Sequence, residues 1–243
     1  MHENTQLSSD QRTAPVRSTD APVIIVGAGL SGLYAAYLLH KRGVKSILVE
    51  ANDRIGGRIQ SINLPSHGDN REQFDMGPAW FWPTMNPLFN GLVQELNLTA
   101  CQQYSQGDYL IEEAIDQLAR AYGSGQINQP ASQRLEGGML SMVKVLLSRL
   151  DADSVMLNTR VTAISKTDSG DYRVIATQNN QALELHADSV ITTIPLRLMA
   201  RSIQFTPKLP TSVTEKMRSL PTWMAAHAEI VAIYPTPFWR SQG

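Results

Sequence analysis

The sequence has little of several features that would assign a protein to a class at once. Its one cysteine, Cys101, excludes an internal disulfide framework and is typical of a reducing compartment. No run of about 18 apolar residues is present, so no membrane-spanning helix is expected. The formal net charge of −1 gives no overall attraction to nucleic acid or to an anionic membrane. Met1 to Ala21 is polar and lacks the apolar core of a secretion signal, so we expect a disordered tail and a cytoplasmic protein.

A glycine-rich turn near the start carries the strongest pattern. Residues 23–26 are all β-branched and apolar, and Gly27, Gly29 and Gly32 follow in the spacing G-x-G-x-x-G. In this pattern the first glycine permits a tight turn, the second lets a pyrophosphate approach the backbone, and the third lets the next helix pack closely on the strand. The N-terminus of that helix attracts anions. The pattern predicts a dinucleotide site, and the alternative is a glycine turn that binds no nucleotide.

An acidic residue closes this unit. A second apolar run, 47–49, ends at Glu50, about 20 residues after the glycines, where dinucleotide-binding units carry an acid. Its carboxylate can accept hydrogen bonds from both ribose hydroxyls, and its charge disfavours the 2′-phosphate of NADP. Arg54 and Arg58 follow and can neutralise pyrophosphate charge, unless they only belong to a solvated loop.

Three segments together resemble the flavin-containing amine oxidase superfamily, of the monoamine oxidase type. Residues 50–58 resemble its extended FAD fingerprint E-A-x-x-R-x-G-G-R, and Phe74 to Pro83 resembles its segment D-x-G-(G/P)-x-W. Pro237-Phe238-Trp239 matches its P-F-W turn. The resemblance covers nearly everything after Ala21. It implies an α/β fold: a Rossmann-like FAD-binding domain, with a doubly wound parallel sheet and a β-meander crossover, plus a partial α+β substrate domain.

The resemblance also implies the domain division. The tail is expected at 1–21, the FAD-binding domain at 22–83 and 135–202, and the partial substrate domain at 84–134 and 203–243. Hydrophobic periodicity predicts helices at 33–41, 87–96, 109–122, 139–150 and 214–219. It predicts strands at 59–64, 155–157, 160–165, 172–177, 182–185, 190–194 and 226–234, with a turn at 65–70 and a linker at 123–133. The four strands from 155 to 185 resemble the β-meander of the family.

The cofactor that the resemblance implies is FAD. Gly77 would approach the isoalloxazine ring and Trp80 would shape a pocket over it, whereas the neighbouring Phe81 and Trp82 could equally be plain core. Val161 would meet the adenine through its backbone groups, and Thr193 and Ile194 fall at the carboxyl end of the returning strand, where doubly wound sheets bind ligands. The complete expected set is Gly27, Ala28, Gly29, Leu30, Ser31, Gly32, Glu50, Ala51, Arg54, Gly57, Arg58, Gly77, Pro78, Ala79, Trp80, Val161, Thr193 and Ile194.

Two departures from the family pattern bear on mechanism. Family oxidases usually carry a lysine on the strand before P-F-W, where it holds a water at flavin N5, and here that position is Glu229. A carboxylate does not replace an ammonium electrostatically, so no catalytic residue is assigned. The chain also ends at Gly243, shortly after P-F-W. We therefore expect the N-terminal portion of an oxidase, with a partner chain or self-association covering an unpaired sheet edge.

The leading hypothesis is an FAD-dependent oxidoreductase of the amine oxidase type. It would oxidise a primary or secondary amine to an imine, with hydride transfer to flavin N5 and reduction of O2 to H2O2. The expected partners are a small-molecule amine and O2, and no nucleic acid, membrane or metal is expected. Two alternatives stay open: a non-catalytic FAD-binding module, and an FAD-dependent C–C desaturase. Peroxide release with a panel of amines separates the first hypothesis from the other two.

Overall fold

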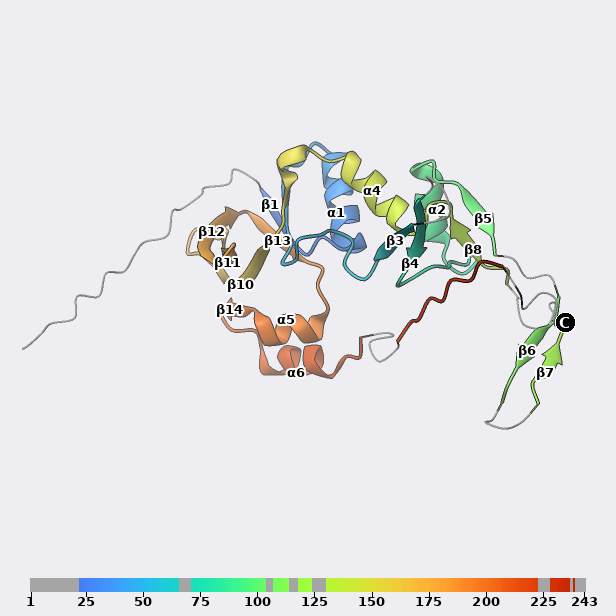
Figure 1. Ribbon diagram of the computed structural model, residues 1–243. Coiled ribbons are helices and arrows are strands. Elements are labelled where there is room, and N and C mark those ends of the chain that lie inside the picture. The colour runs from blue at the N-terminus through green and yellow to red at the C-terminus, as the bar shows by residue number, and fades with distance from the viewer. Residues whose placement is uncertain are drawn as a thin grey trace, which may run out of the picture. The chain divides into compact units, whose positions relative to one another are not determined.

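The computed structural model describes residues 22–65, 71–103, 107–113, 118–123, 130–222, 228–236 and Phe238 (Figure 1). The chain divides into two compact units, the first comprising residues 1–55 and 152–223 and the second 56–151 and 224–243. Each is described by itself. The expected tail at 1–21, the turn at 66–70 and most of the expected linker lie outside the described residues. The domain boundaries expected from the sequence stay a prediction.

A parallel sheet forms the centre of the first unit. Its strands are β1 (Val23–Val26), β2 (Ser46–Val49), β9 (Val155–Met156) and β13 (Ser189–Thr192), in the order β13-β1-β2-β9 with every pair parallel. Helix α1 (Leu30–His40) connects β1 to β2, and all four residues of β1 are buried. An unbroken apolar strand is typical of a parallel sheet covered on both faces. The Rossmann-like fold expected from the sequence is confirmed.

A β-meander forms a second sheet in the same unit. Strands β10 (Thr159–Lys166), β11 (Tyr172–Gln178) and β12 (Gln181–Ala187) are antiparallel neighbours, and β14 (Gln204–Thr206) lies parallel to β10 on its other side. Asn179 and Asn180 join β11 to β12 with φ of 49° and 64°, the left-handed conformation that tight hairpins need. The meander is confirmed. The strand expected at 155–157 is present as β9, but it pairs in parallel with β2 and therefore belongs to the other sheet and not to the meander.

One hydrophobic cluster joins the two sheets. Ile24 and Val26 of β1 and Val49 of β2 pack in it with side chains of the meander and of the helices α5 (Leu196–Ser202) and α6 (Thr211–Ser219). Its other members are Val161, Ile164, Val174, Ala176, Leu183, Leu185, Ala187, Met199, Ile203 and Met217. Ile25 and Leu48 alternate with the first group and are fully buried toward the opposite face, where α1 contacts both strands.

Over its described residues, the second unit consists of antiparallel strand pairs and the helices α2 (Pro87–Glu95) and α4 (Leu140–Ser148). Strand β3 (Ser61–Pro65) pairs with β4 (Arg71–Asp75), β5 (Ala100–Gln102) with β8 (Gln133–Leu135), and β6 (Tyr109–Ile111) with β7 (Arg120–Tyr122), all antiparallel. Helices α2 and α4 occupy two segments in which helices were predicted. The α2 and α4 predictions are therefore confirmed.

The helix predicted at 109–122 is wrong, because this segment contains β6 and β7. Its apolar stripe at helical spacing is not buried: Leu110 is 63% exposed and Leu118 is 97% exposed. A short helix depends on burial of an apolar face for its stability. Cross-strand pairing takes its place, with Tyr109 opposite Tyr122, and the Tyr122 hydroxyl donates a hydrogen bond of 2.7 Å to Glu113.

The strand predicted at 226–234 is also wrong over its described residues. Residues 228–234 are exposed and pair with no described strand, although the run is rich in β-branched residues. A strand is stabilised by its ladder and by packing of its side chains, so pattern alone does not form one. Residues 226 and 227 lie outside the described part, as do Pro237 and Trp239 of the expected P-F-W turn.

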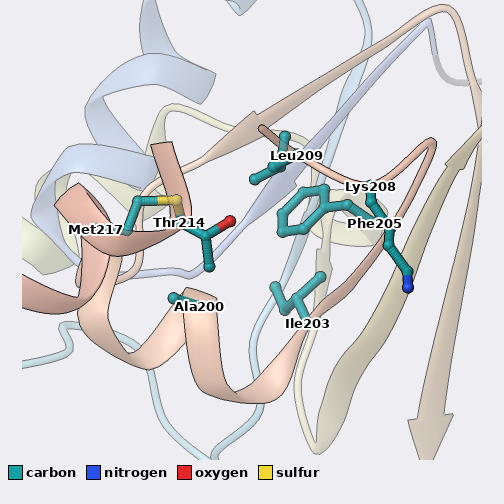
Figure 2. A pocket seen from close by; sticks show the side chains of 7 residues that line it. All are labelled: Ala200, Ile203, Phe205, Lys208, Leu209, Thr214 and Met217. Atoms are coloured by element: carbon teal, nitrogen blue, oxygen red, sulfur yellow. The ribbon is translucent and has the colours of Figure 1, made fainter. Parts of the chain in front are cut away.

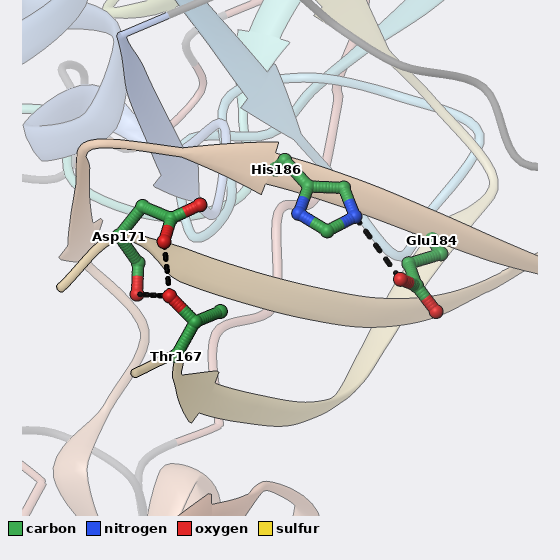
Figure 3. A network of polar contacts seen from close by, with 4 residues as sticks. All are labelled: Thr167, Asp171, Glu184 and His186. Atoms are coloured by element: carbon green, nitrogen blue, oxygen red, sulfur yellow. Dashed lines mark hydrogen bonds and ion pairs between the residues drawn. The ribbon is translucent and has the colours of Figure 1, made fainter. Parts of the chain in front are cut away.

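The turn between β10 and β11 is closed by a polar network (Figure 3). The Thr167 hydroxyl donates to the carbonyl and to the carboxylate of Asp171, and the Ser169 hydroxyl donates to the same carboxylate. These bonds, that from Ser169 first, lower the pKa of Asp171 from its ordinary value of 3.8 because they favour the charged form. Nearby on β12, His186 and Glu184 contact each other at 3.0 Å.

Truncation of Leu185 tests the shared core. Leu185 is fully buried in the cluster between the two sheets, so Leu185→Ala removes packed methyl groups and leaves a cavity. We expect a loss of about 2–5 kcal/mol in the free energy of unfolding, measured by urea denaturation. Leu110→Ala, at an exposed site, is the control and should change stability by less than about 0.5 kcal/mol. Equal effects of the two changes would contradict the assigned core.

The Asp171 network predicts a pH dependence. A carboxyl whose pKa is lower in the folded state contributes stability above its unfolded pKa, and this contribution is lost as the pH falls through the folded pKa. An NMR titration should therefore place the Asp171 midpoint below 3.8. Ser169→Ala removes the largest cause and should raise the midpoint. An unchanged midpoint in that variant would show that the Ser169 bond does not set the pKa.

Candidate functional site

The glycine turn after β1 has no room for side chains. Gly27 has a φ of +104°, and a Cβ added there would lie 2.8 Å from Thr193 Oγ1. A Cβ on Gly32 would lie only 1.9 Å from the carbonyl oxygen of Gly27, so α1 approaches the turn as closely as backbone allows. The Thr193 hydroxyl donates hydrogen bonds of 3.0 Å to the carbonyls of Val26 and Gly27. The structure thus brings the predicted Gly27, Gly32 and Thr193 together, with Ile194 Cγ2 3.0 Å from the added Gly27 Cβ.

The N-terminus of α1 is suited to an anion. Gly29 is its N-cap residue, no side chain caps it, and its first turn contains no acidic residue. The first N–H groups of a helix lack intrahelical partners and carry a partial positive charge. Leu30 and Ser31 begin the helix, and Ser31 is exposed. The predicted pyrophosphate contact therefore has the donors that it needs.

Glu50 lies at the carboxyl end of β2, beside the glycine turn. It is 7% exposed; Oε2 accepts a hydrogen bond of 2.8 Å from Ala28 N, and Oε1 accepts two of 2.9 Å from Asn52 N and Nδ2. An ionised carboxylate offers about four acceptor positions, so Oε2 can still accept a bond from a hydroxyl group. This residual capacity, beside a close-packed glycine turn and an uncapped helix, fits the ADP half of FAD. The bond from Asn52 was not foreseen, since nothing in the motif requires an amide there.

Other predicted residues of the first unit lie in β10 and in the segment after β2. Thr159, at the start of β10, donates its N–H to the Glu50 carbonyl at 2.7 Å, which holds the meander to the end of β2. The Val161 side chain is buried in the core cluster, so only its backbone is available for the predicted adenine contact. Ala51 is half-buried, and the exposed Arg54 donates a bond of 3.3 Å to the Ile55 carbonyl.

The second unit holds the segment predicted to face the flavin ring. A Cβ on Gly77 would lie 2.4 Å from the Arg58 carbonyl oxygen, so these two predicted residues meet backbone to backbone. Gly57 has a φ of +59°, and Arg58 and Pro78 are exposed. Ala79 is buried, which makes it a packing residue of the segment.

The three aromatic residues after Ala79 have different surroundings. Phe81 is buried with its ring centroid 5.0 Å from that of Phe89, so it is core. Trp80 and Trp82 are exposed by 48% and 37%. Trp80 Nε1 donates a bond of 3.0 Å to Gln103 Oε1, and Arg134 Cζ lies 5.8 Å from the Trp80 ring centroid. Sequence reasoning missed Gln103 and Arg134, because strand pairing over long separations brings them to Trp80.

Asp75 fastens this segment to the start of α4. It is 6% exposed and accepts hydrogen bonds from the Ser61 hydroxyl at 2.9 Å and from Met139 N at 3.2 Å. A Cβ on Gly138 would lie 2.7 Å from Asp75 Oδ1, and Gly138 has a φ of +74°. A carboxylate at a helix N-terminus is stabilised by the helix dipole. The sequence assigned Asp75 only to a motif, and no local signal predicted this contact.

A separate hollow of about 180 Å³ lies in the first unit, between α5, β14 and α6 (Figure 2). It is lined by Ala200, Ile203, Phe205, Lys208, Leu209, Thr214 and Met217. No predicted cofactor residue lines it, and the Lys208 ammonium points away from it in Figure 2. We therefore interpret it as a gap in the packing of these elements.

Two absences hold for the described residues alone. No group of three or more His, Cys, Asp or Glu side chains there could hold a metal ion. Within the same ranges, no helix is both long and apolar enough to cross a bilayer. Glu229 is exposed and outside any strand, so its predicted place on a strand is not found.

Comparison with known protein families agrees with this geometry. The model of an NAD(P)-binding Rossmann-like domain matches residues 25–96, and the model of flavin-containing amine oxidoreductases matches residues 96–243, more than half of the chain. The chain belongs to the flavin-containing amine oxidoreductase family. FAD, expected from the fingerprint, is thereby supported as the cofactor.

Individual relatives are similar over parts of their length. A probable flavin-containing monoamine oxidase A of Dictyostelium discoideum is 34% identical over 160 residues, which is 65% of this chain and 32% of the relative. Flavin-containing amine oxidase B of Mus musculus is 40% identical over 81 residues, 33% of this chain and 15% of that protein. The chain thus spans a third or less of these relatives. A structure of wild-type putrescine oxidase bound to putrescine is also similar. The match covers 94% of this chain and 69% of the putrescine oxidase chain, with a TM-score of 0.69. At 22% sequence identity, it shows the shared fold.

The close approach at Gly32 gives a matched pair of glycine substitutions. Gly32→Ala places a methyl group against the Gly27 carbonyl, so we expect a loss of about 1–3 kcal/mol in stability, as for overpacking, and a displaced turn. Gly91 lies in α2 with nothing within 4 Å of an added Cβ, and Gly91→Ala should raise stability by up to about 1 kcal/mol through helix propensity. Both are measured by urea denaturation. Tolerance of Ala at Gly32 would refute the packing role.

Proposed function

We propose that this chain binds FAD and forms part of an amine oxidase that acts on a primary or secondary amine. The observation that carries the proposal is the grouping of a close-packed glycine turn, an uncapped helix N-terminus and the buried Glu50 carboxylate. The N–H groups at the start of α1 bind the pyrophosphate, and Glu50 Oε2 accepts a ribose hydroxyl. Arg54 and Arg58 add positive charge to the phosphate contacts.

When bound, FAD would supply the redox chemistry, which is oxidation of the amine to an imine and reduction of O2 to H2O2. The chain's own task is to hold and orient. Gly77 has no side chain, so its backbone can lie against the ring, and the exposed Trp80 indole offers the substrate an apolar wall. Val161, Thr193 and Ile194 complete the proposed cofactor contacts of the first unit.

No residue is assigned a catalytic role. Glu229 stands where the family usually has a lysine, and it is exposed outside any strand. This favours a second candidate function, a non-catalytic FAD-binding module. Peroxide release from a panel of amines distinguishes the two functions, because a non-catalytic module would bind flavin but would produce no peroxide.

Flavin retention is the decisive measurement. The gently purified full chain should show a flavin absorption spectrum and release FAD on acid treatment. Glu50→Ala removes a charge-assisted acceptor and should weaken FAD binding by about tenfold or more. Glu184→Ala, which removes a half-buried carboxylate on β12, is the control and should bind as before. A chain that stays colourless after incubation with FAD would refute the proposal.

A further inference from the structure

A cation and an aromatic ring lie together on the surface of the second unit. The Arg134 guanidinium carbon is 5.8 Å from the centroid of the Trp80 ring, within the range of a cation–π contact. Leu135, the next residue of β8, is buried, so strand alternation directs Arg134 away from that buried face. Both partners are therefore open to a ligand, since Trp80 is 48% exposed and Arg134 is half-buried.

The Trp80 ring is also held in place. The Trp80 indole N–H donates to Gln103 Oε1 at 3.0 Å, which restrains the ring. Gln103 is itself tied to the neighbouring strand, because its N–H donates to the Ser132 carbonyl at 3.0 Å. Because the ring is restrained before a ligand binds, little side-chain entropy of Trp80 is lost on binding.

The guanidinium keeps its hydrogen-bonding capacity. Among the residues that the structure describes, no carboxylate forms an ion pair with Arg134 and no side chain accepts a hydrogen bond from it. Cys101, which lies opposite in the β5–β8 register, brings no negative charge. A guanidinium presents five N–H donors in a planar fork that matches a carboxylate in two parallel bonds. A half-buried guanidinium that has no carboxylate partner among the described residues can therefore receive an anionic ligand.

We propose that Arg134 and Trp80 form a subsite for a carboxylate carried by the amine substrate. The guanidinium binds the carboxylate, and the indole face packs against the hydrocarbon next to it. The inference rests on the proposed function, which places the Gly77–Trp80 segment beside the flavin ring. It names the substrate class: amines that also bear a carboxylate, such as amino acids. A substrate with a second cation instead would meet the positive charge of Arg134 and be disfavoured.

Ligand binding tests the subsite without any need for turnover. The probes are 3-phenylpropanoate and its neutral analogue 3-phenylpropanamide, followed by tryptophan fluorescence of the full chain. We expect the carboxylate to bind about tenfold or more tightly than the amide, and Arg134→Gln to remove this difference. Arg134→Lys should restore part of it, because an ammonium keeps the charge but loses the planar fork. Trp80→Phe should abolish the fluorescence change, while calorimetry should still detect binding of 3-phenylpropanoate.

Matched controls define what would overturn the subsite. Arg120, an exposed arginine on β7 paired with Glu113 at 3.7 Å, is the control position, and Arg120→Gln should leave the affinity unchanged. Equal affinity for carboxylate and amide, or an unchanged affinity in Arg134→Gln, overturns the proposal. Inorganic phosphate that binds as tightly as 3-phenylpropanoate overturns it too, because the site would then recognise an anion without its hydrocarbon.

Turnover separates this inference from the proposed activity. In a peroxide assay, the ratio of kcat/KM for phenylalanine to that for 2-phenylethylamine should fall about tenfold in Arg134→Gln, mainly through KM for phenylalanine. A fall in kcat alone, with KM unchanged, contradicts a binding role. If no amine releases peroxide, the proposed activity fails, whereas the fluorescence titration still decides the carboxylate subsite on its own.

Discussion

The contact between the start of α1 and the glycine turn is the constraint on which the first unit depends. A methyl group on Gly32 would come within 1.9 Å of the Gly27 carbonyl, so helix and strand can approach only because a side chain is missing. That approach aims the N-terminus of α1 at the carboxyl ends of β1 and β2, where Glu50 is also found. The geometry of the dinucleotide site thus depends on close packing, because this packing positions the helix N-terminus that attracts the anion.

Each unit places a buried carboxylate at a junction of elements. Glu50 links the turn after β1 to the segment after β2, and Asp75 links the β3–β4 hairpin to the start of α4. Both accept hydrogen bonds from backbone N–H groups, which is what makes burial of a charge tolerable. The two residues differ in their remaining capacity, because Gly138 lies close against the Asp75 oxygens whereas Glu50 Oε2 accepts a single bond.

The sequence predicted well where local pattern and tertiary burial agree. The G-x-G-x-x-G turn, β1 and the meander strands β10 to β12 are each determined by short-range signals that the core then reinforces. The prediction from sequence was wrong where burial of side chains determines which secondary structure forms. Residues 109–122 carry a helical stripe that stays exposed, and residues 228–234 carry a strand composition with no described neighbour to pair with. Arg134 and Gln103 were missed at Trp80 for a related reason, since no motif records a contact made by strand pairing.

The hydroxyl of Thr193 has a consequence for the order in which the chain matures. It bonds to the Gly27 carbonyl across 166 positions of sequence. A nascent chain in which β13 has not yet left the ribosome already contains every glycine of the turn, but it lacks the side chain that braces it. The glycine turn is therefore completed only when β13 pairs with β1 along its full length. Until then the turn lacks the hydrogen bonds that the Thr193 hydroxyl donates to the carbonyls of Val26 and Gly27.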